Sequence, residues 1–168
     1  MKRIDAYWKT RNAVSIALLP LSWLFLLLSS LRRALFRRGI FKTHKMSAPV
    51  IVVGNIGVGG SGKSPLVIWL AKHLQSIGKR PGIVARGYGG KAKVWPQEVR
   101  AGSDPHAVGD EPVMIARLSG CPMSVGPDRV AAARALLAHK DCDIIISDDG
   151  MQHYALGRDM EIAVVDGY

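Results

Sequence analysis

The feature that most constrains the fold of this 168-residue chain is a glycine-rich motif between two apolar stretches. Residues 57–64 read GVGGSGKS and fit the pattern G-x-x-x-x-G-K-[S/T] without a gap. The β-branched run at 50–53 predicts a buried strand before the motif. The apolar spacing over 65–77 predicts a helix after it, which ends at Gly78. A strand, a glycine-rich loop and a helix in this order are typical of a polyphosphate-binding loop.

The chemistry of the motif assigns roles to its residues. Backbone N–H groups of the loop can face phosphate oxygens, Lys63 can place its charge at the β- and γ-phosphates, and the Ser64 hydroxyl can ligate Mg²⁺. A valine at position 58, instead of the lysine of partitioning-type ATPases, and the lack of an N-K-x-D motif favour an ATP-using enzyme. The predicted nucleotide-binding residues are Gly57, Val58, Gly59, Gly60, Ser61, Gly62, Lys63 and Ser64.

The rest of the chain alternates between apolar runs and helical patterns. Further strands are expected at 82–85, 123–125, 143–147 and 162–165, and further helices at 111–118 and 127–139. This order predicts an α/β fold, a parallel sheet with flanking helices like that of P-loop NTPases.

Acidic residues follow or begin several of these elements. Asp148 and Asp149 come directly after a predicted strand, where ligands of open α/β sheets bind, and adjacent carboxylates near phosphate require a cation. A plain Asp-Gly turn is the alternative, which the nearby phosphate loop disfavours. Asp110 and Glu111 begin a predicted helix. Their spacing favours capping by Asp110, and the sharper alternative is a general base that accepts a hydroxyl proton.

Three further side chains lie in loops that can reach the same edge of the sheet. Arg86 and Tyr88 are either contacts to an anionic substrate or nucleotide or ordinary loop residues, and His153 follows the Asp149 turn closely. No Cys/His spacing for zinc occurs, and two cysteines cannot make a disulfide framework.

The N-terminal part has a different composition. Residues 13–31 carry no charge, and a helix of this length covers about 28 Å, close to the thickness of a bilayer core. We expect a membrane helix, either spanning or monotopic. A cleaved signal peptide and a buried soluble helix are the weaker alternatives, and Arg32-Arg33 argues against cleavage.

Charge separates the chain into two expected domains, a membrane-associated part at 1–46 and a P-loop core at 47–168. Of the net charge of +10, the first part carries +9, from ten Lys/Arg and one acid, and the second carries only +1. Basic residues that flank an apolar segment indicate membrane lipids as partners, and they argue against nucleic acid.

The motifs VGNIGVGGSGKSPLV, ARGYGG, GDEP, VGPDR and DDGMQH follow the membrane segment in one order. In this the chain closely resembles the tetraacyldisaccharide 4′-kinase family of lipid A biosynthesis, over essentially its whole length. The resemblance implies a Gram-negative inner-membrane enzyme with its active site at the cytoplasmic face. Such an enzyme transfers the γ-phosphate of ATP, with Mg²⁺, to the 4′-hydroxyl of an acylated glucosamine disaccharide 1-phosphate, which forms lipid IVA. No obligate protein partner is evident.

The resemblance also implies roles for the candidate residues. Asp110 becomes the expected catalytic base beside Lys63, and Glu111 joins Ser64, Asp148 and Asp149 near Mg²⁺. The remaining candidates, Arg86, Tyr88 and His153, become substrate or nucleotide contacts.

Members of the family are about twice as long as this chain, so we expect it to be incomplete. The missing half would carry a second lobe, a further acid near Mg²⁺ and a histidine that pairs with the base. We therefore expect nucleotide binding with little or no kinase turnover. Two alternatives stay open: a membrane-attached P-loop ATPase that acts on another partner, and a non-catalytic nucleotide-binding remnant.

Overall fold

The computed structural model describes residues 16–55 and 62–165. The chain divides into two compact units, of which one ends at Lys42 and the other begins at Thr43. The predicted domain boundary lies four residues later, so residues 43–46 belong to the unit that contains the sheet. Five of the predicted nucleotide-binding residues lie outside the described residues: Gly57, Val58, Gly59, Gly60 and Ser61.

The first unit contains helix α3 (Leu19–Arg37), which extends past the predicted apolar segment through Arg32 and Arg33. By length and composition α3 is the one helix among the described residues that could cross a membrane. Its apolar side chains are open to solvent, with 67% of Trp23 and 70% of Phe25 exposed. Within the described part of the chain none of the residues of α3 is buried. A continuous apolar surface of this kind is unfavourable in water and suits lipid.

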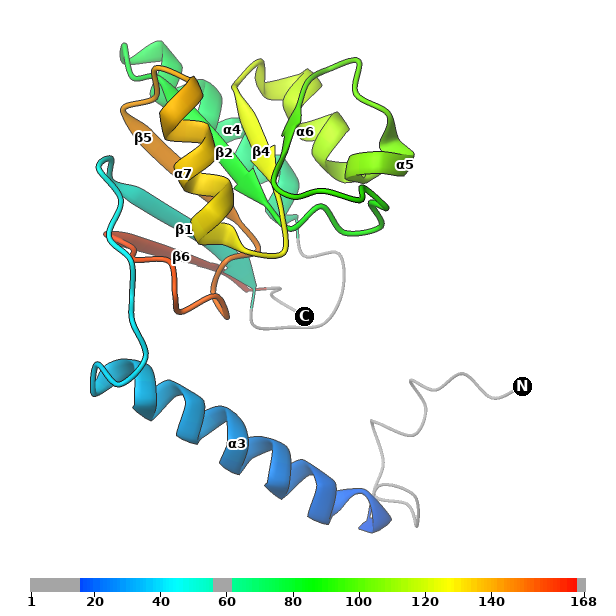
Figure 1. The fold of residues 1–168 in the computed structure, drawn as a ribbon, viewed down its shortest axis with the longest axis vertical. Helices are drawn as coiled ribbons and strands as arrows, with labels where there is room; N and C mark the ends of the chain where they lie inside the picture. Colours follow the sequence, from blue (N-terminus) through cyan, green and yellow to red (C-terminus); the bar gives the residue numbers. More distant parts are fainter. Residues whose placement is uncertain (1–15, 56–61, 166–168) are drawn as a thin grey trace. The chain divides into compact units, whose positions relative to one another are not determined.

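The second unit is built on one six-stranded sheet with the order β3-β4-β2-β5-β1-β6 (Figure 1). Its strands are β1 (Val50–Asn55), β2 (Pro81–Ala85), β3 (Gln97–Val99), β4 (Met123–Val125), β5 (Ile144–Asp148) and β6 (Met160–Val164). Neighbouring strands are parallel, except that β3 runs antiparallel to β4 at one edge.

Helices cover both faces of this sheet. They are α4 (Lys63–Ser76), α5 (Pro105–Val108), α6 (Asp110–Ser119) and α7 (Arg129–His139). Along β1, Ile51 and Val53 pack on the side of α4 and α6, whereas Val50 and Val52 pack on the side of α7 (Figure 1). Burial on both faces explains why the strand is a continuous apolar run instead of an alternating one.

The predicted α/β fold is confirmed, with two corrections. The stretch between β2 and α6 contains the short strand β3 and the single turn α5, which the apolar pattern did not indicate. The sheet is also not wholly parallel, because β3 is an antiparallel edge strand.

Candidate active site

Among the described residues, several predicted site residues lie directly after β2 and β5 or at the start of the helix that follows β1. Val53 in β1 is paired with Asp148 in β5, so the chain enters the glycine-rich motif beside the strand end that carries the two aspartates. Next to β5, β2 ends at Ala85, immediately before Arg86. Parallel strands end at a common edge of the sheet, and this is where open α/β proteins bind their ligands.

Lys63 begins α4 and already contacts one of the aspartates. Its Nζ lies 2.6 Å from Oδ1 of Asp149, and the two side chains are 20% and 64% exposed. An ion pair that faces solvent to this extent contributes at most about 1 kcal/mol. The ammonium group can therefore exchange this carboxylate for phosphate oxygens at little cost in stability.

Ser64 makes the second contact between the motif and an acid. Its hydroxyl donates a hydrogen bond to Oε1 of Glu111 in the first turn of α6. A predicted Mg²⁺-ligating hydroxyl and a predicted Mg²⁺-associated carboxylate are thus in direct contact, although 47 positions separate them in the sequence.

Asp148 has the most perturbed environment in the site. It is 5% exposed, and its Oδ1 has no hydrogen-bond partner within the described residues. Burial raises the pKa of Asp148 to about 6, and the negative charges of Glu111 and Asp149 add to the shift, against the opposing charges of Lys63 and Arg129. A bound cation would relieve this unfavourable charge, so the residues present fit Mg²⁺.

Protein carboxylates alone do not make a closed metal cage here. Across residues 16–55 and 62–165, no group of three or more His, Cys, Asp or Glu side chains is arranged to hold a metal ion. Mg²⁺ commonly keeps several waters and takes one or two carboxylates together with substrate phosphates. An open site with Ser64 and the acids on one side is consistent with this coordination preference of Mg²⁺.

The backbone of the turn after β5 determines where Asp148 and Asp149 lie. Asp149 has a φ of +50°, a left-handed conformation that aspartate tolerates better than most residues. At the next position a Cβ on Gly150 would lie 2.4 Å from the buried Oγ of Ser147. Only glycine fits there, so the backbone of the turn stays close to the strand end.

Asp110 is the first residue of α6, and it does not cap the helix. The N-cap position belongs to Gly109, and no side chain accepts a hydrogen bond there. The capping interpretation of Asp110 is therefore wrong, because the helix begins one residue earlier than the pattern indicated. The carboxylate is exposed at the N-terminus of α6.

The loop that carries Arg86 and Tyr88 packs against this helix start. Gly109 has a φ of +94°, and a Cβ there would lie 2.4 Å from the carbonyl oxygen of Tyr88. The two predicted segments, ARGYGG and GDEP, are thus in contact through their backbones. The side chains of Arg86 and Tyr88 are exposed, and 80% of Tyr88 faces solvent.

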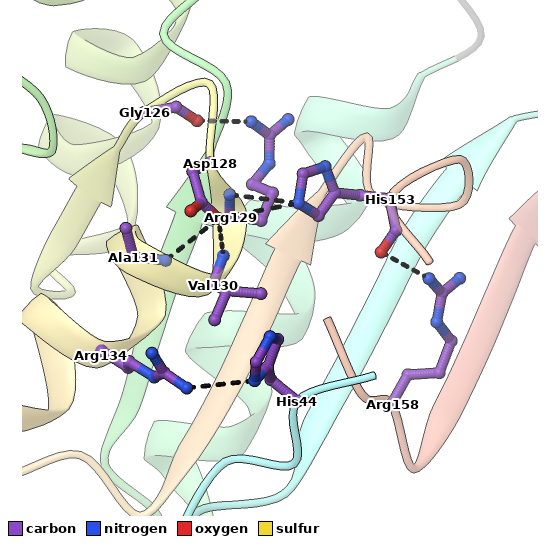
Figure 2. A network of polar contacts seen from close by, with 9 residues as sticks. All are labelled: His44, Gly126, Asp128, Arg129, Val130, Ala131, Arg134, His153 and Arg158. Atoms are coloured by element: carbon purple, nitrogen blue, oxygen red, sulfur yellow. Dashed lines mark hydrogen bonds and ion pairs between the residues drawn. The ribbon is translucent and has the colours of Figure 1, made fainter. Parts of the chain in front are cut away.

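Arg129, the first residue of α7, is a site residue that the sequence reasoning missed. It is 3% exposed, its Nη1 donates to the carbonyl oxygen of Gly126 at 2.8 Å, and its Nε has no partner among the described residues (Figure 2). Burial lowers the pKa of Arg129 to about 10, and the charges of Asp148 and Asp149 oppose that shift. Its place in the VGPDR motif, at a predicted helix start, was the available signal.

His153 lies at the same helix start. Its Nε2 accepts a hydrogen bond from the backbone N–H of Arg129 at 3.3 Å, while the carboxylate of Asp128 accepts from Val130 and Ala131 (Figure 2). The structure therefore brings His153 to α7 and to Arg129. The backbone N–H of His153 donates to the carbonyl oxygen of Gly150 at 2.9 Å, which ties His153 to the turn after β5.

A mainly parallel sheet with a G-x-x-x-x-G-K-S motif between β1 and α4, and acids at the end of β5, defines a P-loop nucleotide-binding protein. The family described as tetraacyldisaccharide-1-P 4′-kinase, LpxK, matches residues 14–168. The chain belongs to this family, as its motifs predicted.

Individual relatives agree with this assignment. The chain is 56% identical to the tetraacyldisaccharide 4′-kinase of Nitrosococcus oceani, over 96% of this chain and 48% of the relative. It is 57% identical to that of Aromatoleum aromaticum, over 98% of this chain and 49% of the relative. The crystal structure of the "apo" form of LpxK from Aquifex aeolicus in complex with ATP aligns with a TM-score of 0.80 and 34% identity, over 89% of this chain and 48% of that one. The chain spans about half the length of the curated relatives it matches.

Proposed function

We propose that this chain binds ATP with Mg²⁺ and serves the transfer of the γ-phosphate to the 4′-hydroxyl of tetraacyldisaccharide 1-phosphate, which forms lipid IVA. The observation that carries the proposal is the pair of contacts from the end of the motif, Lys63 with Asp149 and Ser64 with Glu111. Membership of the kinase family and the ATP complex of the Aquifex aeolicus relative support it.

In this proposal the glycine-rich motif at 57–64 cradles the phosphates, and Lys63 exchanges Asp149 for phosphate oxygens. The residues that would hold Mg²⁺ are Ser64, Glu111, Asp148 and Asp149. Oδ1 of Asp148 has no hydrogen-bond partner in the described part of the chain, which supports this choice. The bound ion would neutralise charge on the phosphates.

Asp110 is the proposed base that accepts the proton of the 4′-hydroxyl. Its carboxylate is exposed in the first turn of α6, where a substrate hydroxyl can reach it. The loop with Arg86 and Tyr88 packs beside it and is proposed to contact the substrate or the nucleotide. His153 is likewise proposed to contact the substrate or the nucleotide.

The N-terminal unit is proposed to hold the enzyme at the cytoplasmic face of the inner membrane. The acyl chains of the substrate stay in the bilayer, while its sugar headgroup must meet water-soluble ATP. An enzyme attached at the interface is already close to the headgroup, which favours the encounter and the alignment of the hydroxyl. The apolar surface of α3 and the basic residues that follow it support attachment to anionic lipid.

A binding and transfer assay on the full chain in detergent micelles tests the proposal. Calorimetry measures uptake of ATP with Mg²⁺, and γ-labelled ATP with tetraacyldisaccharide 1-phosphate measures transfer. Asp110→Asn is expected to retain ATP binding and lose any transfer, whereas Lys63→Ala is expected to lose both. ATP hydrolysis that ignores the glycolipid would indicate an ATPase, and ATP binding without product would indicate a non-catalytic remnant. A chain that takes up no ATP would contradict all three.

A further inference from the structure

We propose that residues 43–45, here called the strap, are positioning residues that hold the loop at 151–159, here called the return loop, in the geometry that nucleotide binding requires. The return loop runs from the Asp149 turn to β6 and carries His153. This inference rests on the proposed function, and it adds a role for a segment that the sequence analysis placed with the membrane flank.

The strap is joined to the return loop like a strand. The backbone N–H of His44 donates to the carbonyl oxygen of Ala155 at 2.7 Å, and the N–H of Gly157 donates to the carbonyl oxygen of His44 at 2.9 Å. These two bonds make a parallel bridge between His44 and Leu156. Leu156 is 1% exposed and packs in the core beneath α7, so the bridge is anchored to a rigid part of the fold.

Side chains add further contacts. The Thr43 hydroxyl donates to the carbonyl oxygen of Tyr154 at 3.2 Å. Nδ1 of His44 lies 3.2 Å from Nη2 of Arg134 on α7 (Figure 2). The strap thus contacts both the return loop and the helix whose first residue is Arg129.

The return loop is itself hydrogen-bonded to the candidate site through His153. The carbonyl oxygen of His153 accepts from Nη2 of Arg158 at 2.8 Å (Figure 2). The backbone N–H of His153 donates to the carbonyl oxygen of Gly150 at 2.9 Å. Its imidazole accepts from the N–H of Arg129 at 3.3 Å. Gly150 follows Asp149, the partner of Lys63. A shift of the return loop would therefore displace both the turn that carries Asp149 and the start of α7 that carries Arg129.

The strap buries little apolar surface of its own. Thr43 and Lys45 are exposed, His44 is half-buried, and the contacts above are polar. Segments held in this way open locally at a low free energy, well below that of global unfolding. Loosening the strap is therefore expected to change the return loop and the site more than the overall stability.

Gly157→Ala loosens the strap selectively. A Cβ at Gly157 would lie 2.9 Å from the carbonyl oxygen of His44 and 3.2 Å from Cα of Lys45, which are both backbone atoms. The φ of Gly157 lies outside the left-handed region, and the three atoms nearest to the added Cβ all belong to the strap. Gly102→Ala is the matched control, because its Cβ would meet nothing within 4 Å.

The experiment uses the full chain in lipid nanodiscs and measures the Kd for ATP with Mg²⁺, amide hydrogen exchange over the return loop, and the melting temperature without ligand. In Gly157→Ala we expect faster exchange at His153 and Gly157 and an affinity about two- to tenfold weaker, the effect of one or two weakened hydrogen bonds. The melting temperature should remain close to that of Gly102→Ala. His44→Ala, which keeps the backbone bridge, should show a smaller change in the same direction.

The outcomes separate the two proposals. A wild-type chain that binds no ATP would overturn the proposed function, and this inference with it. If the wild-type chain binds ATP and both Gly157→Ala and His44→Ala bind it with the wild-type Kd, the proposed role of the strap is overturned and the proposed function is not. A lower melting temperature with unchanged affinity and exchange would show that the strap is merely structural.

Discussion

Replacing Asp148 by asparagine should stabilise the ligand-free protein while it removes Mg²⁺-dependent nucleotide binding. Asp148 is 5% exposed and its Oδ1 has no partner among the described residues, so its negative charge is poorly solvated. Burial first, and then the charges of Glu111 and Asp149, raise its pKa from 3.8 to about 6. Asparagine has the same shape and no charge.

The sign and size of the effect follow from this shift. Because the pKa is raised in the folded state, the protonated form contributes stability that is fully present below pH 3.8 and is lost as the pH rises through about 6. A shift of roughly two units corresponds to about 3 kcal/mol, and the new amide N–H groups need partners, so Asp148→Asn should gain about 1–3 kcal/mol at pH 7.5.

Urea unfolding of both proteins in micelles with EDTA, at pH 4.5 and 7.5, measures this difference. The gain should be large at pH 7.5 and shrink at pH 4.5, where wild-type Asp148 is protonated. Addition of ATP and Mg²⁺ should reverse the order, because a ligand stabilises only the protein that binds it. A variant that is no more stable than wild type at pH 7.5, or a gain that is independent of pH, would refute the reasoning.

Two further substitutions test the local structure around the site. Asp128→Ala removes the carboxylate that accepts hydrogen bonds from two N–H groups in the first turn of α7. This change should lower the free energy of unfolding by about 1 kcal/mol, whereas Asp128→Asn, which keeps an acceptor oxygen, should retain most of that stability. Gly109→Ala forces a φ of +94° on alanine and brings a Cβ to 2.4 Å from the Tyr88 carbonyl oxygen, and it should cost about 1–3 kcal/mol or more. Gly102→Ala should leave unfolding unchanged, and an equal loss in that control would contradict the argument for Gly109.

The central strands could be predicted because burial on both faces makes them continuous apolar runs. The edge strand β3 could not, since Gln97–Val99 is short and mostly polar. Glu98 accepts hydrogen bonds from Arg100, two residues away, and from the distant Lys140, and these partners lower the pKa of Glu98 to about 2. Lys140 lies 42 positions away, so no local pattern reveals the pair.

The rule that parallel strands end at the same edge of a sheet accounts for the nearness of Lys63 to Asp149, which follows β5. It does not account for the contact between Ser64 and Glu111, because Glu111 lies in the first turn of α6 and is assigned to the site only through the family resemblance. The exact start of α6, which decides whether Asp110 caps it, depends on a single residue and could not be fixed from periodicity. The strap could not be found either, because it is joined to the return loop by two backbone hydrogen bonds and one hydrogen bond from a threonine hydroxyl, between segments that are distant in the sequence.

The most direct test of the account is titration calorimetry of ATP into the folded full chain, with and without Mg²⁺, for wild type and Lys63→Ala. Lys72→Ala, a lysine on α4 outside the motif, is the control. We predict Mg²⁺-dependent uptake by wild type and Lys72→Ala and none by Lys63→Ala. Uptake that is absent from wild type, or that is unchanged in Lys63→Ala, would contradict the claim that this loop and the acids at the end of β5 form a nucleotide site.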